Sequence, residues 1–255
     1  FLNSGLIFPL GASSDGTCMP FSGILHGNGH VIKGLGMDNT NKRNYKHGGL
    51  FCSLQNATIE NLIIDSSCNF SGYSAGALSV TSEGPLIMKN VRNNANVNGY
   101  YESVGGFIGS LKDSKDGTTT VLFSGCTNNG NVVGKANHSG GFLGIVESTT
   151  NLTLTFSNNI NKGNVIGNKD NTGGFIGYIQ TLSDMNIVFS NGQNKGNIIG
   201  SDRNTGGFIG HIEGTDATMV TMTNCKWWID WIYQHLQLNF NFQWQKSRKY
   251  HWKWK

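Results

Sequence analysis

Short apolar segments separated by polar turns recur along this chain, as in Gly174–Ile179, Asn186–Phe189 and Asn197–Ile199. In the first segment a Phe, a Gly two residues later and an aliphatic residue two further on stay constant between copies, while the position between the last two varies. Alternation with one constant apolar face predicts a β-strand with that face buried. The constant apolar residues are Phe107, Phe142, Phe175 and Phe208 in the first segment, and Phe123, Phe156, Phe189 and Met222 in the second.

These segments belong to a repeat of about 33 residues. Gly-Gly-Phe-Ile/Leu-Gly begins at Gly105, Gly140, Gly173 and Gly206, with spacings of 35, 33 and 33 residues. A fixed period of this size indicates a stacked array in which each copy packs on its neighbours. Three strands per period and no helix predict an all-β fold, a right-handed parallel β-helix of about seven three-strand rungs. A β-sandwich or a β-propeller is the alternative.

Asn and Gly recur at the predicted turns, and both fit stacked rungs. Asn side chains at one repeat position can bond amide to amide along the axis and form an asparagine ladder. The paired glycines are expected to supply positive φ at a corner. The recurring asparagines are Asn96, Asn131, Asn164 and Asn197 at one position, and Asn128, Asn161 and Asn194 at another.

The net positive charge comes from the end of the chain. Five of the 19 basic residues and one of the 15 acidic residues lie in the last 29 positions, so the remainder is formally neutral. All six Trp and none of the 36 Gly lie in that tail. We therefore divide the chain into a repeat domain, residues 1–226, and a Trp/Lys-rich tail, residues 227–255. A neutral body gives no reason to expect nucleic acid as a partner, and no apolar run is long enough for a membrane span.

The tail is interpreted as an out-of-frame or mis-spliced continuation of the repeats. Trp has a single codon, so Trp227-Trp228-Ile-Asp-Trp231, translated one base later, encodes Gly-Gly-x-x-Gly. The same shift turns Lys249–Lys255 into a pattern like Asn197-Ile-Ile-Gly-Ser201. On this hypothesis the natural protein continues with further repeats, the last strand stops near Cys225, and the tail folds back as a short helix around Trp228–Leu238.

The chain resembles the GLUG-motif repeat proteins. The resemblance rests on Phe21-Ser-Gly-Ile-Leu-His-Gly-Asn-Gly-His-Val-Ile-Lys-Gly-Leu35, on Gly49-Leu-Phe51, on Asn56-Ala-Thr-Ile-Glu-Asn-Leu62 and on the Gly-Gly-Phe-Ile-Gly copies. It covers residues 5 to about 226. It implies an adhesin-like or filamentous-haemagglutinin-like surface β-helix, secreted or at the cell surface, and it offers no catalytic residues.

Candidate chemistry is sparse, so no catalytic, cofactor or metal site is predicted. Glu147 and Glu213 share a repeat position with Gln180 between them, which places them two rungs and about 10 Å apart. They are interpreted as solvated loop acids, as are Asp113 with Asp116 and Glu213 with Asp216. His26 and His30 flank a turn, and no His pair has metal-ligand spacing.

The five cysteines are odd in number and contain no CxxC, so neither a zinc site nor a disulfide framework is expected. Cys126 and Cys225 share a repeat position three rungs apart, too far for a disulfide, and are predicted to be buried thiols. Four Asn-x-Ser/Thr triplets are candidate glycosylation sites if the chain is secreted by a eukaryote, at Asn56, Asn69, Asn137 and Asn151.

These observations favour a non-enzymatic repeat segment of a larger surface or secreted protein. Its expected role is adhesive or stalk-like, with weak binding to a glycan or a host or cell-surface macromolecule, and its other partners are the flanking repeats. The first alternative is a carbohydrate-active β-helix enzyme of the polysaccharide lyase or hydrolase kind. The second is an ice- or surface-binding solenoid, which needs a regular ladder of Thr that residues 118–120, 149–150 and 218 do not provide.

Overall fold

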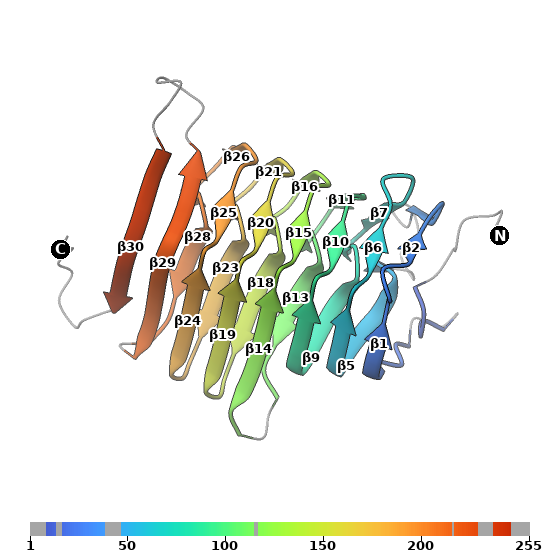
Figure 1. The fold of residues 1–255 in the computed structure, drawn as a ribbon, viewed down its shortest axis with the longest axis horizontal. Coiled ribbons are helices and arrows are strands. Elements are labelled where there is room, and N and C mark those ends of the chain that lie inside the picture. Colours follow the sequence, from blue (N-terminus) through green and yellow to red (C-terminus); the bar gives the residue numbers. More distant parts are fainter. Residues whose placement is uncertain are drawn as a thin grey trace.

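The structure is a computed structural model that describes residues 9–13, 17–38, 47–114, 117–215, 217–228 and 237–245. In this part of the chain every regular element is a β-strand. The strands wind into a parallel β-solenoid of about six turns with a period of about 33 residues (Figure 1). The predicted fold class is confirmed, with about one turn fewer than expected.

The turns that begin at β13, β18 and β23 each carry five strands, because two-residue strands flank the three predicted ones, and the turns that begin at β5 and β9 carry four. Two sets are longer and belong to one large sheet. The first set contains β13 (Ile108–Lys112), β18 (Leu143–Ser148), β23 (Ile176–Thr181) and β28 (Ile209–Glu213). The second contains β1 (Phe21–His26), β14 (Thr119–Ser124), β19 (Leu152–Ser157), β24 (Met185–Ser190) and β29 (Thr218–Trp228). Two strands pass through both sets, β5 (Phe51–Glu60) and β9 (Ser79–Lys89).

The remaining sets are short. The large sheet continues in β2 (Val31–Ile32), β6 (Ile63–Ile64), β10 (Arg92–Asn93), β15 (Thr127–Asn128), β20 (Ile160–Asn161) and β25 (Gln193–Asn194). One six-stranded sheet holds β3 (Gly36–Asp38), β7 (Asn69–Gly72), β11 (Asn96–Gly99), β16 (Val132–Gly134), β21 (Val165–Gly167) and β26 (Ile198–Gly200). The other holds β4 (His47–Gly48), β8 (Ser74–Gly76), β12 (Val104–Gly105), β17 (Ser139–Gly140), β22 (Thr172–Gly173) and β27 (Thr205–Gly206).

The core consists of columns of identical side chains along the axis. Ring centroids of Phe107, Phe142, Phe175 and Phe208 follow one another at 4.9, 4.7 and 4.9 Å. A second column, Phe123, Phe156 and Phe189, repeats at 5.0 and 4.8 Å and meets the first edge-on. The predicted phenylalanine stack is therefore present and doubled, and it fixes the register of all turns that contain it.

The paired glycines do not supply positive φ, contrary to expectation. They are required because the backbone packs closely there: a Cβ on Gly105 would overlap the carbonyl oxygen of Ile108, and one on Gly106 that of Gly141. Positive φ is supplied at turns by Asn instead, for example at Asn158 and Asn191. A short polar side chain tolerates this conformation better than other non-glycine residues.

Asparagine forms two ladders along the axis. The first is buried: each side-chain amide donates to the next carbonyl oxygen at 2.9 Å, through Asn93, Asn128, Asn161 and Asn194. The second, Asn96, Asn131, Asn164 and Asn197, was expected to bond in the same way. Here each side-chain oxygen accepts from the backbone N–H of the next asparagine, at 3.0 Å.

The end of the solenoid differs from the expectation for the tail. β29 continues to Trp228, three residues beyond Cys225, so the boundary at 226 falls inside a strand. β30 (Gln237–Gln245) then pairs with β29 in antiparallel orientation (Figure 1). The predicted helix is contradicted at both ends, which are strands, and its middle, residues 229–236, lies outside the described residues, as does 246–255.

Candidate functional groove

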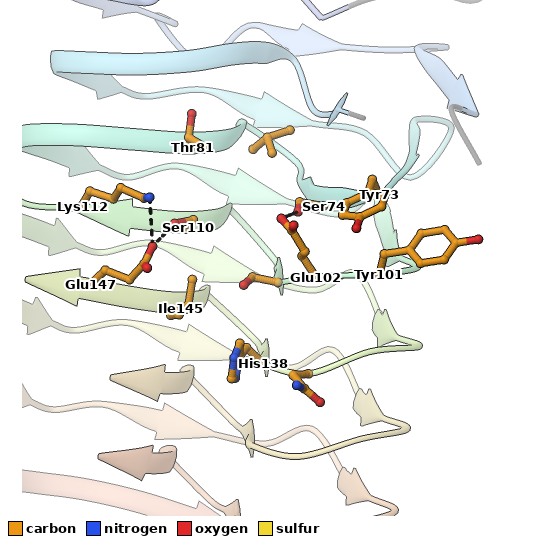
Figure 2. A pocket seen from close by; sticks show the side chains of 13 residues that line it. Tyr73, Ser74, Thr81, Tyr101, Glu102, Ser110, Lys112, His138, Ile145 and Glu147 are labelled. Atoms are coloured by element: carbon orange, nitrogen blue, oxygen red, sulfur yellow. Dashed lines mark hydrogen bonds and ion pairs between the residues drawn. The ribbon is translucent and has the colours of Figure 1, made fainter. Parts of the chain in front are cut away.

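A groove of about 450 Å³ lies on the lateral wall of the solenoid (Figure 2). One wall consists of outward side chains of β9, β13 and β18. The other consists of β8 and of the connections that precede β8, β12 and β17. The lining residues that carry chemistry are Tyr73, Ser74, Tyr101, Glu102, Ser103, Ser110, Lys112, Asn137, His138 and Glu147.

A change in loop length accounts for the groove. Gly72 pairs with Gly99, and Ala75 pairs with Val104, so two residues lie between Gly72 and Ala75 where four lie between Gly99 and Val104. The later turns also use four residues in this place. The wall made by these connections is therefore interrupted after β7, and the groove lies beside the interruption. The sequence carried this signal, because Gly72 and Gly76 are four residues apart, whereas Gly99 and Gly105 are six apart.

The strand wall presents an ion pair. Lys112 Nζ lies 3.2 Å from Glu147 Oε2, and the Ser110 hydroxyl donates to the same oxygen at 3.3 Å. Glu147 stands in register with Gln180 and then Glu213, as the repeat predicted. Glu213 accepts a hydrogen bond from the Tyr178 hydroxyl. Both acids thus lie on strands rather than in loops and have protein partners, and both side chains still reach solvent.

The loop wall is aromatic and acidic. The rings of Tyr73 and Tyr101 stack at 4.7 Å, and Tyr101 is 62% exposed at the rim. The Ser74 hydroxyl donates to Glu102 Oε2 at 3.0 Å (Figure 2). Within the described residues Glu102 has no cationic partner. Ser103 is only 6% exposed, and its hydroxyl has no hydrogen-bond partner in the described part of the chain.

A column of rings continues from the groove along the axis. The ring of Tyr178 stacks on His138 at 4.6 Å and on His211 at 5.6 Å. Asn171 Nδ2 donates to His138 Nδ1 at 3.1 Å. Burial lowers the pKa of His138, so its imidazole is neutral at physiological pH. Burial and the hydrogen bond to Glu213 raise the pKa of Tyr178, which keeps the phenol protonated.

Other candidate residues lie away from the groove. Asp113, expected to be a solvated loop acid, is 7% exposed and accepts hydrogen bonds from Thr149 and Thr150. Asp116 and Asp216 fall outside the described residues. His26 was expected to solvate a turn, and its Nδ1 lies 2.6 Å from Glu60 Oε1. Thr119 and Thr218 are buried in one inward row, so they contribute to no outward ladder of threonine.

All four candidate glycosylation asparagines, Asn56, Asn69, Asn137 and Asn151, are exposed. Three stand outside the groove, whereas Asn137 lines it beside His138. The Ser183 hydroxyl donates to Asn151 Oδ1 at 2.8 Å, and Asn98 Nδ2 to Asn69 Oδ1 at 3.3 Å. A sugar on Asn137 would therefore stand in the groove itself.

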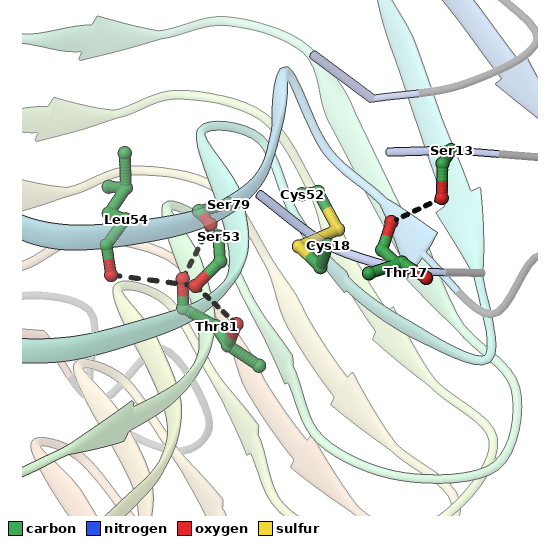
Figure 3. Close-up of a disulfide and its surroundings, with 8 residues drawn as sticks. All are labelled: Ser13, Thr17, Cys18, Cys52, Ser53, Leu54, Ser79 and Thr81. Atoms are coloured by element: carbon green, nitrogen blue, oxygen red, sulfur yellow. Dashed lines mark hydrogen bonds between the residues drawn. A yellow bond between two sulfur atoms is a disulfide. The ribbon is translucent and has the colours of Figure 1, made fainter. Parts of the chain in front are cut away.

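One disulfide was missed by sequence reasoning. Cys18 and Cys52 are joined, and they fasten the segment before β1 to the second turn (Figure 3). Beside them the Ser13 hydroxyl donates to the carbonyl oxygen of Thr17 at 3.0 Å. The odd number of cysteines concealed this bond, because the other three are interior thiols. Cys126 and Cys225 are free and buried as predicted, and burial raises the pKa of Cys126 to about 11.

Among the residues that the structure describes, no three His, Cys, Asp or Glu side chains gather to form a metal site. In the same residues no helix could cross a membrane. No known family model, curated protein or solved structure matches the chain. The geometry of the groove is therefore the evidence from which its function is inferred.

Proposed function

We propose that this chain is a non-enzymatic β-solenoid segment of a larger surface or secreted protein, and that it binds a glycan weakly through the lateral groove. The observation that carries the proposal is an open groove that combines an exposed tyrosine with carboxylate, hydroxyl and amide groups. Sugar rings are recognised by aromatic faces together with a few directional polar groups. The stacked strands hold these groups at a fixed spacing, which suits an extended polymer.

Two features support a location outside the cell. A disulfide persists in oxidising compartments and is rare in the cytosol. Four exposed Asn-x-Ser/Thr triplets suit a secreted chain. The resemblance to GLUG-motif proteins points the same way and rests on the repeat motifs alone.

A carbohydrate-active enzyme remains the alternative, because Glu102 and Glu147 line the same groove. Glycoside hydrolysis needs one carboxyl as acid and another as base or nucleophile. The pairing of Glu147 with Lys112 and Ser110 instead favours a fixed carboxylate that accepts hydrogen bonds from a ligand. An enzyme is therefore the second candidate function.

A glycan panel with product analysis tests the proposal. The protein should retain one class of oligosaccharide and release no shorter product. Tyr101→Ala should abolish retention, because the exposed ring at the rim is lost. Tyr100→Ala is the matched control: Tyr100 lies one residue away, does not line the groove and instead carries Lys135 over its ring at 4.6 Å.

Retention that survives Tyr101→Ala, or no retention of any glycan, would contradict the proposal that the groove binds a glycan. Turnover that is lost in Glu147→Gln would establish the enzyme instead.

A further inference from the structure

The groove carries a carboxylate without a counter-charge. Two carboxylates and one lysine line it, and the lysine is paired with Glu147. Glu102 is left with a single hydrogen bond, from Ser74. An exposed carboxylate of this kind attracts a cation, and the attraction is stronger where neighbouring groups exclude water.

Aromatic rings stand beside that carboxylate. Tyr101 is the preceding residue, and its ring stacks on Tyr73 at the rim. Ring faces attract ammonium groups. The same loop surface already holds a cation in this way, since Lys135 Nζ lies 4.6 Å from the centre of the Tyr100 ring. Carboxylate and ring together form a site for an ammonium group rather than for a neutral one.

A second group in the groove lacks a partner. Ser103 follows Glu102 directly and is only 6% exposed. It lines the groove with a hydroxyl that forms no hydrogen bond to a described residue. The Ser103 oxygen is reachable from the groove, so a ligand hydroxyl or amine can bond to it in place of water. This observation is independent of the charge and also points to a polar ligand at this end of the groove.

We infer that the groove selects a glycan with free amino groups, an oligosaccharide of glucosamine type, whose ammonium lies beside Glu102 and the Tyr73–Tyr101 pair. This inference rests on the proposed function. It adds that the free amine, rather than the sugar ring alone, determines selectivity. An N-acetylated sugar of equal length lacks the positive charge and loses both the ion pair and the cation–ring contact.

Isothermal titration with two oligomers of equal length, one of glucosamine and one of N-acetylglucosamine, tests this at about pH 5.5, where amines are protonated and carboxylates are mainly ionised. The wild-type protein should bind the amino oligomer about tenfold more tightly. Glu102→Gln should bring the two affinities to within about twofold without weakening the acetylated oligomer. Asp202→Asn, which removes an exposed carboxylate from the corresponding loop two turns beyond His138, should keep the full ratio.

Four outcomes would contradict the inference. Equal affinities in the wild-type protein, or a ratio that survives Glu102→Gln, would remove the amine selectivity and leave glycan binding intact. Binding of neither oligomer, with no other glycan retained, would overturn the proposed function as well. A lysine-rich peptide that depends on Glu102 while both sugars fail would assign the groove to a protein partner.

Discussion

Asparagine performs three separate functions in this chain. At inward positions such as Asn128 its amide spans the rise between turns and satisfies the neighbouring carbonyl. At turns such as Asn158 it adopts positive φ. At Asn131 its oxygen accepts the backbone N–H of the next turn. A residue with a short side chain, a donor and an acceptor meets all three demands, which explains why asparagine recurs at fixed positions of the repeat.

Asp113 serves a comparable structural role with a charge. Its Oδ2 accepts the backbone N–H of Thr149 at 2.7 Å and the hydroxyl of Thr150 at 2.7 Å, which ties its loop to the corner of the next turn. Burial alone would raise the pKa of this carboxyl, but the hydrogen bonds from Thr150 and Thr149 outweigh it, and the pKa lies below its ordinary value.

Replacing Asp113 should therefore produce a pH-dependent loss of stability. A carboxyl whose pKa is depressed by folding stabilises the protein above its unfolded pKa of about 3.9, and this contribution is lost as the pH falls through the folded pKa. We expect Asp113→Asn to cost about 2 kcal/mol at neutral pH. The difference from wild type should shrink below about pH 4.

Urea unfolding at a series of pH values measures this difference. Asp202→Asn, in an exposed loop, should leave the free energy of unfolding unchanged. A difference between Asp113→Asn and wild type that is the same at pH 3 and pH 7 would contradict the assignment.

Among the elements, the two phenylalanine columns determine how the turns fit together. Phe142 contacts Phe156 edge-on at 5.8 Å, and Phe156 contacts Phe175 at 5.7 Å, so the rings interlock between the two columns. Phe175 stacks on Phe142 and Phe208 and meets Phe156 and Phe189 edge-on. A change in one turn is thus felt in both adjacent turns.

Phe175→Ala should destabilise the solenoid by about 3–5 kcal/mol, because it opens a ring-sized cavity between fully buried neighbours. Phe175→Leu fills most of that space and should cost clearly less. Denaturant unfolding with matched m-values compares the two. Leu182→Ala, at a side chain that is 76% exposed, is the control and should have little effect. Equal costs for the two Phe175 variants would show that the site is not closely packed.

The repeat allowed the strands, the inward residues and the buried asparagine ladder to be predicted, because each of these recurs at a fixed interval. Features that occur once could not be found this way. The groove depends on a two-residue difference between the connections after β7 and β11, and the Cys18–Cys52 bond lies in the least regular part of the chain. The role of Asp113 also depends on a pairing across turns that spacing alone does not reveal.

At the scale of the whole molecule, a solenoid must protect two open ends. The disulfide and the bridge between Leu10 and Phe51 hold the N-terminal segment on the second turn. At the other end the asparagine ladder stops: Trp227 takes the register position after Asn194, whose Nδ2 is buried without a partner. The indole of Trp has an N–H donor and no acceptor oxygen, so it cannot continue the ladder from the Asn194 amide.

β30 covers the edge of β29 in antiparallel orientation, so the tail acts as a cap whatever its origin. Deleting residues 229–255 should leave the urea midpoint close to wild type, because both phenylalanine columns and the buried ladder precede the deletion. The uncovered edge of β29 should then pair with a second copy, since unpaired strand edges template association. Analytical ultracentrifugation over a range of concentrations would show monomers for the full chain and dimers or larger species for the truncated one.

Adding charge in the truncated chain with Thr221→Lys and Thr223→Lys, on the outward side of β29, should restore monomers. Loss of folding on truncation, or a truncated chain that stays monomeric throughout, would show that β30 belongs to the fold or that the edge needs no cover.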